Sequence, residues 1–189
     1  MIVALSGTPG TGKTSVSILL QDLGYEVISL NEIAFKKGFI NGFDKKRKSN
    51  LLDIKKINNY IKNNFKNDNI VFVEGHLSHW LKCADRVIIL RCHPDELRKR
   101  LAFKGWSEEK VQENVHAEIL DVILIETLDV HSEEHIFEID TTGKSVVIVA
   151  SIISEIMNND FKPMKKYNIG GIDWSEEVFK EFLNKEYRG

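Results

Sequence analysis

Short apolar runs alternate with longer segments of helical spacing along this chain. The apolar runs are bounded by turn-forming residues and cover residues 2–5, 25–29, 70–73, 86–90 and, less regularly, 136–139. Apolar positions three or four residues apart indicate helices at residues 15–23, 54–65, 96–101, 107–129 and 144–157. Strands that alternate with helices form a parallel sheet with helices on both faces. The pattern therefore predicts an α/β fold.

Residues 31–52 interrupt this alternation. They contain Gly38, Gly42 and a charged run at residues 44–48, and they show no strand pattern. Because glycines and charges disfavour a packed element, we expect this segment to be a mobile flap.

The last part of the chain also departs from the pattern. Pro163 and the pair Gly170 and Gly171 predict a connector after residue 157. The connector leads to an amphipathic helix that we expect to pack back on the body, although its apolar face could equally dock a partner. That face is formed by Trp174, Val178 and Phe182.

Composition is typical of a globular protein with one core. The 189 residues include 26 basic and 28 acidic side chains, and 42% are apolar. No apolar stretch approaches the roughly 20 residues of a membrane-spanning helix, and no signal peptide precedes the first apolar run. We therefore expect a cytoplasmic protein without a membrane partner. Two cysteines, Cys83 and Cys92, are too few for a disulfide framework, and we expect both to be reduced core residues.

Charge is strongly segregated along the chain. Residues 36–66 hold ten basic side chains against two acidic ones, whereas residues 105–140 hold eleven acidic side chains against one lysine. Such blocks are often only solvated helix faces. The other interpretation is a pair of binding surfaces, in which the basic block contacts phosphates and the acidic block contacts a basic polypeptide.

A glycine-rich motif follows the first apolar run directly. Its sequence is Gly7-Thr8-Pro9-Gly10-Thr11-Gly12-Lys13-Thr14, which fits G-x-x-x-x-G-K-[ST] and opens a predicted helix. Glycines let the backbone N–H groups wrap around phosphates, and the helix adds its positive end. Lys13 can then reach the β- and γ-phosphates, and the Thr14 hydroxyl can ligate Mg²⁺. The motif predicts a nucleoside triphosphate site; the competing interpretation is a simple glycine turn before a helix.

An acidic residue ends the apolar run 70–73. Glu74 can hold Mg²⁺ through a water or orient an attacking water, and the alternative is a buried structural glutamate. His76 follows two residues later, where either a catalytic role or a simple hydrogen bond is open.

Two cations share a helix face in the segment 96–104. Arg100 and Lys104 are four residues apart and can clamp the phosphates of the donor. Glu96 lies four residues before Arg100, so a surface ion pair is the competing interpretation. We considered a zinc site formed by the two cysteines with His76 and His79 and reject it, because the cysteines are nine residues apart.

Several of these segments together resemble the adenylate kinase isoenzyme six family of small nucleoside monophosphate kinases. The resemblance rests on the motif at residues 7–14, Asn31-Glu32-Ile33-Ala34 leading to Gly42-Phe43-Asp44, Val73-Glu74-Gly75-His76, and the run from Arg100-Leu101 to Lys104-Gly105-Trp106-Ser107-Glu108-Glu109-Lys110-Val111 with Glu113-Asn114. It covers about residues 1–160. Glu74 stands where an aspartate is common in that family, and Lys104 stands where an arginine is common.

The resemblance implies a P-loop fold with a five-stranded parallel sheet of order 2-3-1-4-5, an acceptor-binding flap at about residues 29–52 and a short lid at about 103–113. It divides the chain into a kinase domain, 1–160, and a C-terminal connector and helix, 161–189. The ATP phosphate site it implies is formed by Gly10, Gly12, Lys13, Thr14, Ser15 and Lys104.

The same resemblance implies a function. The chain would transfer the γ-phosphoryl group of Mg-ATP to AMP or another nucleoside monophosphate. From the residues themselves, we expect Lys13, Arg100, Glu74 and His76 to be the catalytic residues and Thr14 and Glu74 to lie at the metal. The resemblance also implies ATPase activity, a small-subunit ribosomal protein as partner, contact with rRNA and a role in ribosome maturation. Two alternatives stay open: an ATP-hydrolysing assembly factor in which kinase activity is incidental, and a small-metabolite kinase.

Overall fold

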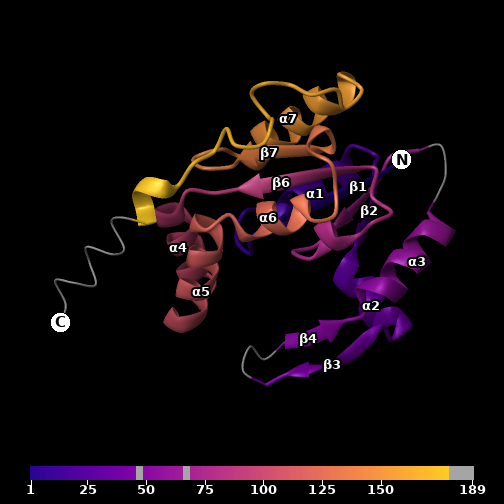
Figure 1. The fold of residues 1–189 in the computed structure, drawn as a ribbon, viewed down its shortest axis with the longest axis horizontal. Helices are drawn as coiled ribbons and strands as arrows, with labels where there is room; N and C mark the ends of the chain where they lie inside the picture. Colours follow the sequence, from indigo (N-terminus) through magenta and orange to yellow (C-terminus); the bar gives the residue numbers. More distant parts are fainter. Residues whose placement is uncertain (46–48, 66–68, 179–189) are drawn as a thin grey trace.

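A parallel sheet forms the centre of the molecule. The structure is a computed structural model that describes residues 1–45, 49–65 and 69–178. Within this part, five strands pair in the order β2-β5-β1-β6-β7, which confirms the expected order 2-3-1-4-5 once the expected strands are numbered along the chain. The strands are β1 (Ile2–Gly7), β2 (Glu26–Ser29), β5 (Val71–Glu74), β6 (Arg86–Arg91) and β7 (Ile136–Asp140) (Figure 1).

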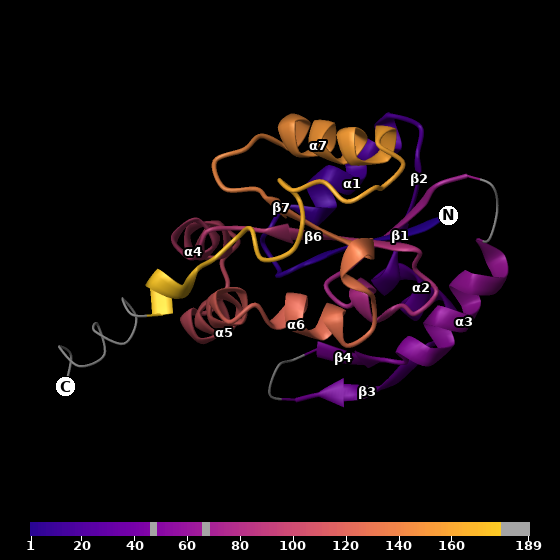
Figure 2. The ribbon, with the colours of Figure 1, turned by 45° about the horizontal axis from the view of Figure 1, so that its top comes forward.

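Helices cover both faces of this sheet (Figure 2). Along β1, Val3 and Leu5 belong to one core and Ile2 and Ala4 to the other, because successive side chains of a strand point to opposite faces. The first core lies under α1 (Lys13–Asp22) and α7 (Val146–Asn158). The second lies under α2 (Leu30–Lys37), α3 (Ile54–Asn64) and α6 (Val122–Leu128). The predicted helices at 15–23, 54–65 and 144–157 are thus confirmed.

A third cluster lies beyond the carboxyl end of β6. There α4 (Pro94–Phe103) packs against α5 (Glu108–Ile119). Two short helical turns lie in other connections: η1 (Ser78–Trp80) lies between β5 and β6, and η2 (Glu133–His135) lies between α6 and β7. The buried residues of the cluster, called here the lid cluster, are Cys92, Leu97, Leu101, Val111, Val115 and Ile119.

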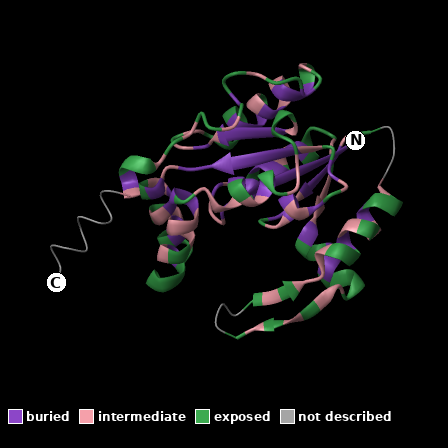
Figure 3. Cartoon of the chain, viewed as in Figure 1, coloured by how far each residue is buried: buried purple, intermediate pink, exposed green. Residues whose placement is uncertain are grey.

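The flap contains strands, so the prediction of no strand pattern was wrong. After α2, β3 (Ile40–Asp44) and β4 (Ser49–Leu52) form an antiparallel hairpin. None of its described residues is fully buried: Phe43 is 56% exposed and Leu51 50% exposed, and Leu52 is only partly buried against the second core. Figure 3 shows this difference between the buried central sheet and the exposed hairpin. The basic positions 46–48 lie outside the described residues.

The single helix expected over residues 107–129 is two helices, α5 and α6. Between them Asp121 has a φ of 53°, a left-handed conformation that ends the first helix. The Asp121 carboxylate accepts a hydrogen bond from Arg91, which holds this conformation. The four-residue spacing of apolar positions continues through the break, so periodicity alone could not reveal it.

The C-terminal segment lies against the body as far as the structure describes it. Phe161 and Tyr167 are buried in the core under α7. Residues 175–178 are helical, Trp174 meets His93 edge-on with 5.1 Å between ring centroids, and Val178 packs on the lid cluster. Phe182 lies outside the described residues. Within the described chain, no helix has the length and apolar character needed to cross a membrane.

Candidate functional site

The glycine motif forms a tight loop between β1 and α1, here called the phosphate loop (residues 7–14). Gly7 has a φ of 140°, and a Cβ there would overlap the carbonyl oxygen of Leu90 on β6. Gly10 has a φ of 97°, and a Cβ there would lie 2.8 Å from Leu97 and 2.9 Å from Leu101 on α4. The backbone contact excludes a side chain at Gly7, and the positive φ strains any residue other than glycine at both positions. The loop can therefore follow this path only with glycine at these positions.

Helix α1 presents its N-terminus to the same loop. Gly12 is the N-cap with a φ of 103°, and the structure shows no side-chain hydrogen bond at this cap. The first amides of a helix lack intrahelical partners and carry the positive end of its dipole. With glycine as cap, these amides are available to an anionic ligand, so the loop and helix together form an anion-binding site.

Lys13 lies folded over the loop. Its Nζ donates to the carbonyl oxygens of Gly7 at 2.5 Å and Thr8 at 3.0 Å, and the residue is only 8% exposed. Burial lowers the pKa of Lys13 to about 8, although the charges of Glu74 and Glu118 act in the opposite direction. The ammonium therefore still carries its proton at neutral pH and gives the loop a buried positive charge.

Glu74 and His76 follow β5, the strand beside β1. Glu74 pairs in register with Leu5, and its charge acts on Lys13, so the carboxylate faces the same edge of the sheet as the loop. Desolvation, followed by the charge of Lys13, places the pKa of His76 below its ordinary value. Solvent still reaches the ring and screens part of this effect.

The expected metal ligands have the right chemistry for magnesium. Thr14 is an exposed hydroxyl on the first turn of α1, and Glu74 is a partly exposed carboxylate on the neighbouring strand. Hard oxygen donors of this kind suit Mg²⁺, which also retains waters and phosphate oxygens as ligands. In the described part of the chain, no group of three or more His, Cys, Asp or Glu side chains gathers to hold a metal. A metal here would thus depend on phosphate oxygens as well.

Arg100 lies beside the loop and already has hydrogen-bond and ion-pair partners. It donates to the carbonyl oxygen of Gly10 at 3.4 Å and that of Thr141 at 3.0 Å, and it pairs with Glu96. The ion pair considered from the sequence is therefore present, and Arg100 would have to exchange these partners to reach a phosphate. Lys104 is exposed at the C-terminus of α4, and its charge acts on Lys13.

A cavity of about 280 Å³ opens next to the loop. It brings together the expected residues Gly10, Gly12, Ser15, Arg100 and Lys104, whereas Lys13, Thr14, Glu74 and His76 do not line it. Its volume is slightly below the range typical of ligand pockets. Its remaining lining residues are Thr11, Val16, Phe103, Thr141, Lys144, Val146 and Val149.

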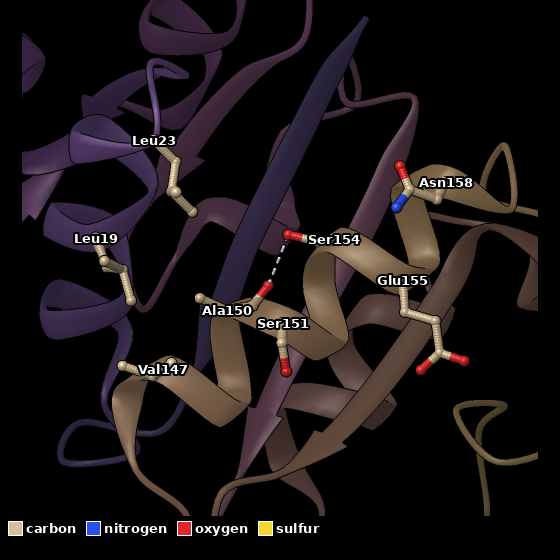
Figure 4. A pocket seen from close by; sticks show the side chains of 8 residues that line it. All are labelled: Leu19, Leu23, Val147, Ala150, Ser151, Ser154, Glu155 and Asn158. Atoms are coloured by element: carbon tan, nitrogen blue, oxygen red, sulfur yellow. Dashed lines mark hydrogen bonds between the residues drawn. The ribbon is translucent and has the colours of Figure 1, made fainter.

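A larger cavity of about 450 Å³ lies elsewhere, in the groove between α1 and α7. Figure 4 shows Leu19 of α1 and Leu23, just after α1, facing Val147 and Ala150 of α7 across it. No residue of the phosphate loop lines this groove. Because anion binding needs the loop and its cations, we place the functional site at the smaller cavity.

Sequence reasoning missed three buried residues that support the loop. The Thr8 hydroxyl donates to Glu118 at 2.5 Å, and Glu118 accepts from Arg91 at 2.8 Å. A signal was present: Glu118 lies three residues after Val115 on the apolar stripe of α5, and Arg91 ends an apolar strand. Charged residues at core positions are almost always paired.

The fold and the site together define a P-loop kinase fold. A glycine loop joins the central strand of a parallel sheet to a helix, and the hairpin β3–β4 and the helices α4 and α5 lie outside this sheet (Figure 1). Residues 3–121 match the family described as an AAA domain.

Comparison with known proteins places the chain more closely. It is 44% identical over 188 residues to a protein of Archaeoglobus fulgidus named "Putative adenylate kinase", covering 98% of this chain and 99% of that protein. A protein of Thermococcus gammatolerans with the same name is 44% identical over 184 residues, covering 97% of each chain. The chain therefore belongs to this adenylate kinase-like family.

Solved structures share the fold at low sequence identity. A shikimate kinase from Acinetobacter baumannii in complex with shikimate has a TM-score of 0.58 at 19% identity, covering 84% of this chain and 93% of that chain. A thymidylate kinase from Candida albicans has a TM-score of 0.51 at 13% identity, covering 85% and 92%. At such identity the likeness concerns the fold alone.

Proposed function

We propose that this chain is a nucleoside monophosphate kinase that transfers the γ-phosphoryl group of Mg-ATP to a nucleoside monophosphate, with AMP as the first candidate acceptor. The observation that carries the proposal is the arrangement around Lys13. Its buried ammonium and the uncapped N-terminus of α1 lie at the sheet edge where Glu74 ends β5. The names of the archaeal relatives and the resemblance to the isoenzyme six family support the same reaction.

The donor nucleotide lies along the loop in this proposal. The cavity beside Gly10, Ser15 and Val146 takes the nucleoside, and the α1 amides hold the phosphates. Lys13 leaves the loop carbonyls for the β- and γ-phosphates, and Lys104 contacts the same nucleotide from the lid. Thr14 and Glu74 would hold magnesium together with phosphate oxygens, and the bound ion would supply positive charge against the phosphates.

Transfer needs little covalent work from the protein. A phosphate oxygen of the acceptor attacks the γ-phosphorus, the bond from that phosphorus to the β–γ bridging oxygen breaks, and ATP and AMP become two ADP. Lys13 and Arg100 stabilise the charge on the moving phosphoryl group. Glu74 and His76 orient groups around it from the end of β5.

The flap and the lid supply the acceptor site and its closure. The flap, residues 29–52, consists of α2 and the hairpin, and its exposed Phe35 and Phe43 offer apolar contacts to the acceptor base. The lid, residues 103–113, joins α4 to α5. Closure of both excludes the water that would otherwise hydrolyse ATP, so a weak ATPase activity is the expected side reaction. We assign the kinase domain to residues 1–160 and the connector and helix to 161–189.

A second candidate function is an ATP-hydrolysing assembly factor. Exposed apolar side chains lie among the acidic residues of α5 and α6: Leu120 is 57% exposed and Ile125 55% exposed. An acidic surface with apolar residues suits a basic polypeptide. From the family resemblance we propose a small-subunit ribosomal protein as partner, with rRNA contact and a role in ribosome maturation. Its binding would weaken as ionic strength rises.

The decisive experiment measures ATP consumption with a panel of acceptors. The panel contains the nucleoside monophosphates, shikimate and gluconate, and a basic ribosomal protein is added separately. Rapid ADP formation with AMP or another nucleoside monophosphate, lost in Lys13→Ala, supports the kinase. ATP turnover that needs only the basic protein would support the assembly factor instead, and turnover with shikimate or gluconate alone would overturn both.

A further inference from the structure

The phosphate loop is held from outside by both helices of the lid cluster. On one side, Leu97 and Leu101 of α4 leave no space for a side chain at Gly10, and Arg100 donates to the Gly10 carbonyl oxygen. On the other side, Glu118 of α5 accepts the hydrogen bond of the Thr8 hydroxyl. The loop is thus fixed at two points, one on each helix.

Thr8 is the link between Glu118 and the ammonium of the loop. Thr8 is 2% exposed, and its carbonyl oxygen accepts from Lys13 Nζ at 3.0 Å while its side chain donates to Glu118 Oε2 at 2.5 Å. A displacement of Thr8 would therefore move an acceptor that places Lys13. No position of the phosphate loop other than residue 8 bonds to α5 among the hydrogen bonds of the described chain.

Glu118 itself is held firmly. Its Oε1 accepts from Arg91 Nε at 2.8 Å and from the backbone N–H of Cys92 at 3.1 Å, and both Glu118 and Arg91 are 2% exposed. Arg91 also binds Glu138 and Asp121. Although burial opposes the charge of Arg91, the carboxylates of Glu118, Glu138 and Asp121 outweigh that effect and raise its pKa. A carboxylate oriented by a charged partner and a backbone amide has little freedom to move.

We propose that Glu118 is a positioning residue for the donor phosphates, which acts through Thr8 to set the phosphate loop and Lys13. The proposal rests on the proposed function only in that the loop binds a nucleoside triphosphate. The simpler account is that Glu118 only neutralises Arg91. Arg91 does not need Glu118 for this purpose alone, because it also has Glu138 and Asp121 as carboxylate partners.

Two substitutions at Thr8 test the link with least disturbance. Thr8→Val keeps the shape of the side chain and removes its hydroxyl, whereas Thr8→Ser keeps the hydroxyl. Binding of Mg-ATP and of Mg-tripolyphosphate is measured by calorimetry, and KM and kcat are measured for both substrates. Because a hydrogen bond to a charged group is at stake, we expect Thr8→Val to weaken both phosphate ligands about tenfold. We expect Thr8→Ser to bind them as the wild type does and the KM for the acceptor to stay unchanged in both.

Glu118→Gln and Asp121→Asn form a matched pair at the arginine. Each removes one carboxylate charge from Arg91, but only Glu118 contacts Thr8. We expect Glu118→Gln to weaken Mg-ATP binding and Asp121→Asn to leave it unchanged, and thermal unfolding is measured for both variants alongside. In the double variant with Thr8→Val, Glu118→Gln should add little further loss, because the two residues act through one contact.

The outcomes separate this inference from the proposed function. If the wild type binds Mg-ATP but Thr8→Val binds it equally well, Glu118 is not a positioning residue and the kinase proposal is untouched. Equal losses in Glu118→Gln and Asp121→Asn would show that only the neutralisation of Arg91 matters, which also overturns the inference. If the folded wild type binds neither phosphate ligand, the proposed function itself fails.

Discussion

The rest of the molecule holds the phosphate loop and the flap hairpin very differently. In the loop, Thr8, Thr11 and Lys13 are buried, and residues of α4, α5 and β6 contact it. In the hairpin, Phe43 and Leu51 are half exposed and β3 contacts mainly β4. Under the proposed function, the donor site would therefore be organised before a ligand binds, whereas the acceptor site would have to be completed on binding.

The largest effect is expected when the Lys13 side chain is replaced, which tests how far activity depends on the preorganised loop. Because Lys13→Met removes the buried ammonium of the preorganised loop, we expect phosphoryl transfer to fall by about 10³-fold or more. Steady-state assays with ATP and AMP measure this, and circular dichroism confirms that the variant is folded. Retention of more than a tenth of the activity would remove Lys13 from the mechanism.

Arg100 tests whether the edge of the loop also supplies a catalytic charge. If its guanidinium exchanges Glu96 and Thr141 for phosphate, Arg100→Ala should lower kcat by about 10³-fold. The matched control is Lys99→Ala, an exposed neighbour on the same helix. A loss below tenfold with a lower Tm would instead assign Arg100 to the ion pair with Glu96 and to packing.

Two glycines compare the rigidity of the two regions directly. Gly10→Ala places a Cβ against Leu97 and Leu101 at a φ of 97°, so we expect a loss of stability of about 2–4 kcal/mol. Gly42→Ala in the hairpin meets Leu51 at an ordinary contact distance of 3.7 Å, and we expect a change within about 0.5 kcal/mol. Urea unfolding measures both. Equal losses would contradict the difference between the regions.

The charged Lys13 should also lower the stability of the folded protein at neutral pH. Its pKa is about 8 in the folded protein and 10.5 in the unfolded chain, so the unfolded state binds the proton more tightly. The buried ammonium therefore lowers the free energy of unfolding by its full amount below about pH 8. This destabilisation disappears as the pH rises toward 10.5. We expect Lys13→Met to be more stable by about 1–3 kcal/mol at pH 7, with the gain vanishing by pH 10.5. Thermal unfolding across this range measures it, and a constant difference would contradict the lowered pKa.

The smallest effect concerns the flap. Phe43→Ala removes an exposed aromatic ring, so we expect little change in Tm but a rise of about three- to tenfold in the KM for AMP. The KM for ATP should stay the same, because Phe43 does not line the cavity at the loop. A parallel rise in both KM values would mean that flap and loop act as one unit.

The sheet strands and the loop could be predicted because each depends on residues that are close together in the sequence. The apolar runs locate all five strands of the central sheet, although several strands extend beyond the runs, and the glycine spacing predicted the tight turn before α1. The hairpin and the end of α5 could not be predicted from local patterns. The hairpin has no apolar face to give a period of two, and the end of α5 depends on Asp121 bonding to Arg91, thirty residues away.

Only the part of the site that lies within a sequence motif could be predicted. The motif placed Gly10, Gly12 and Lys13 around one anion-binding loop, but it gave no hint that Arg100 would be engaged by Thr141. The support of Thr8 by Glu118 joins residues 110 positions apart. Such contacts follow from how α5 packs on the end of β6, which no single segment encodes.

The fate of the labelled γ-phosphate tests the central claim most directly. ATP labelled in its γ-phosphoryl group is incubated with unlabelled AMP, magnesium and the full chain, and the products are separated. The account predicts that the label appears in newly formed ADP at its β-position and that its transfer requires AMP. Label released only as inorganic phosphate, at a rate independent of any nucleoside monophosphate, would contradict it.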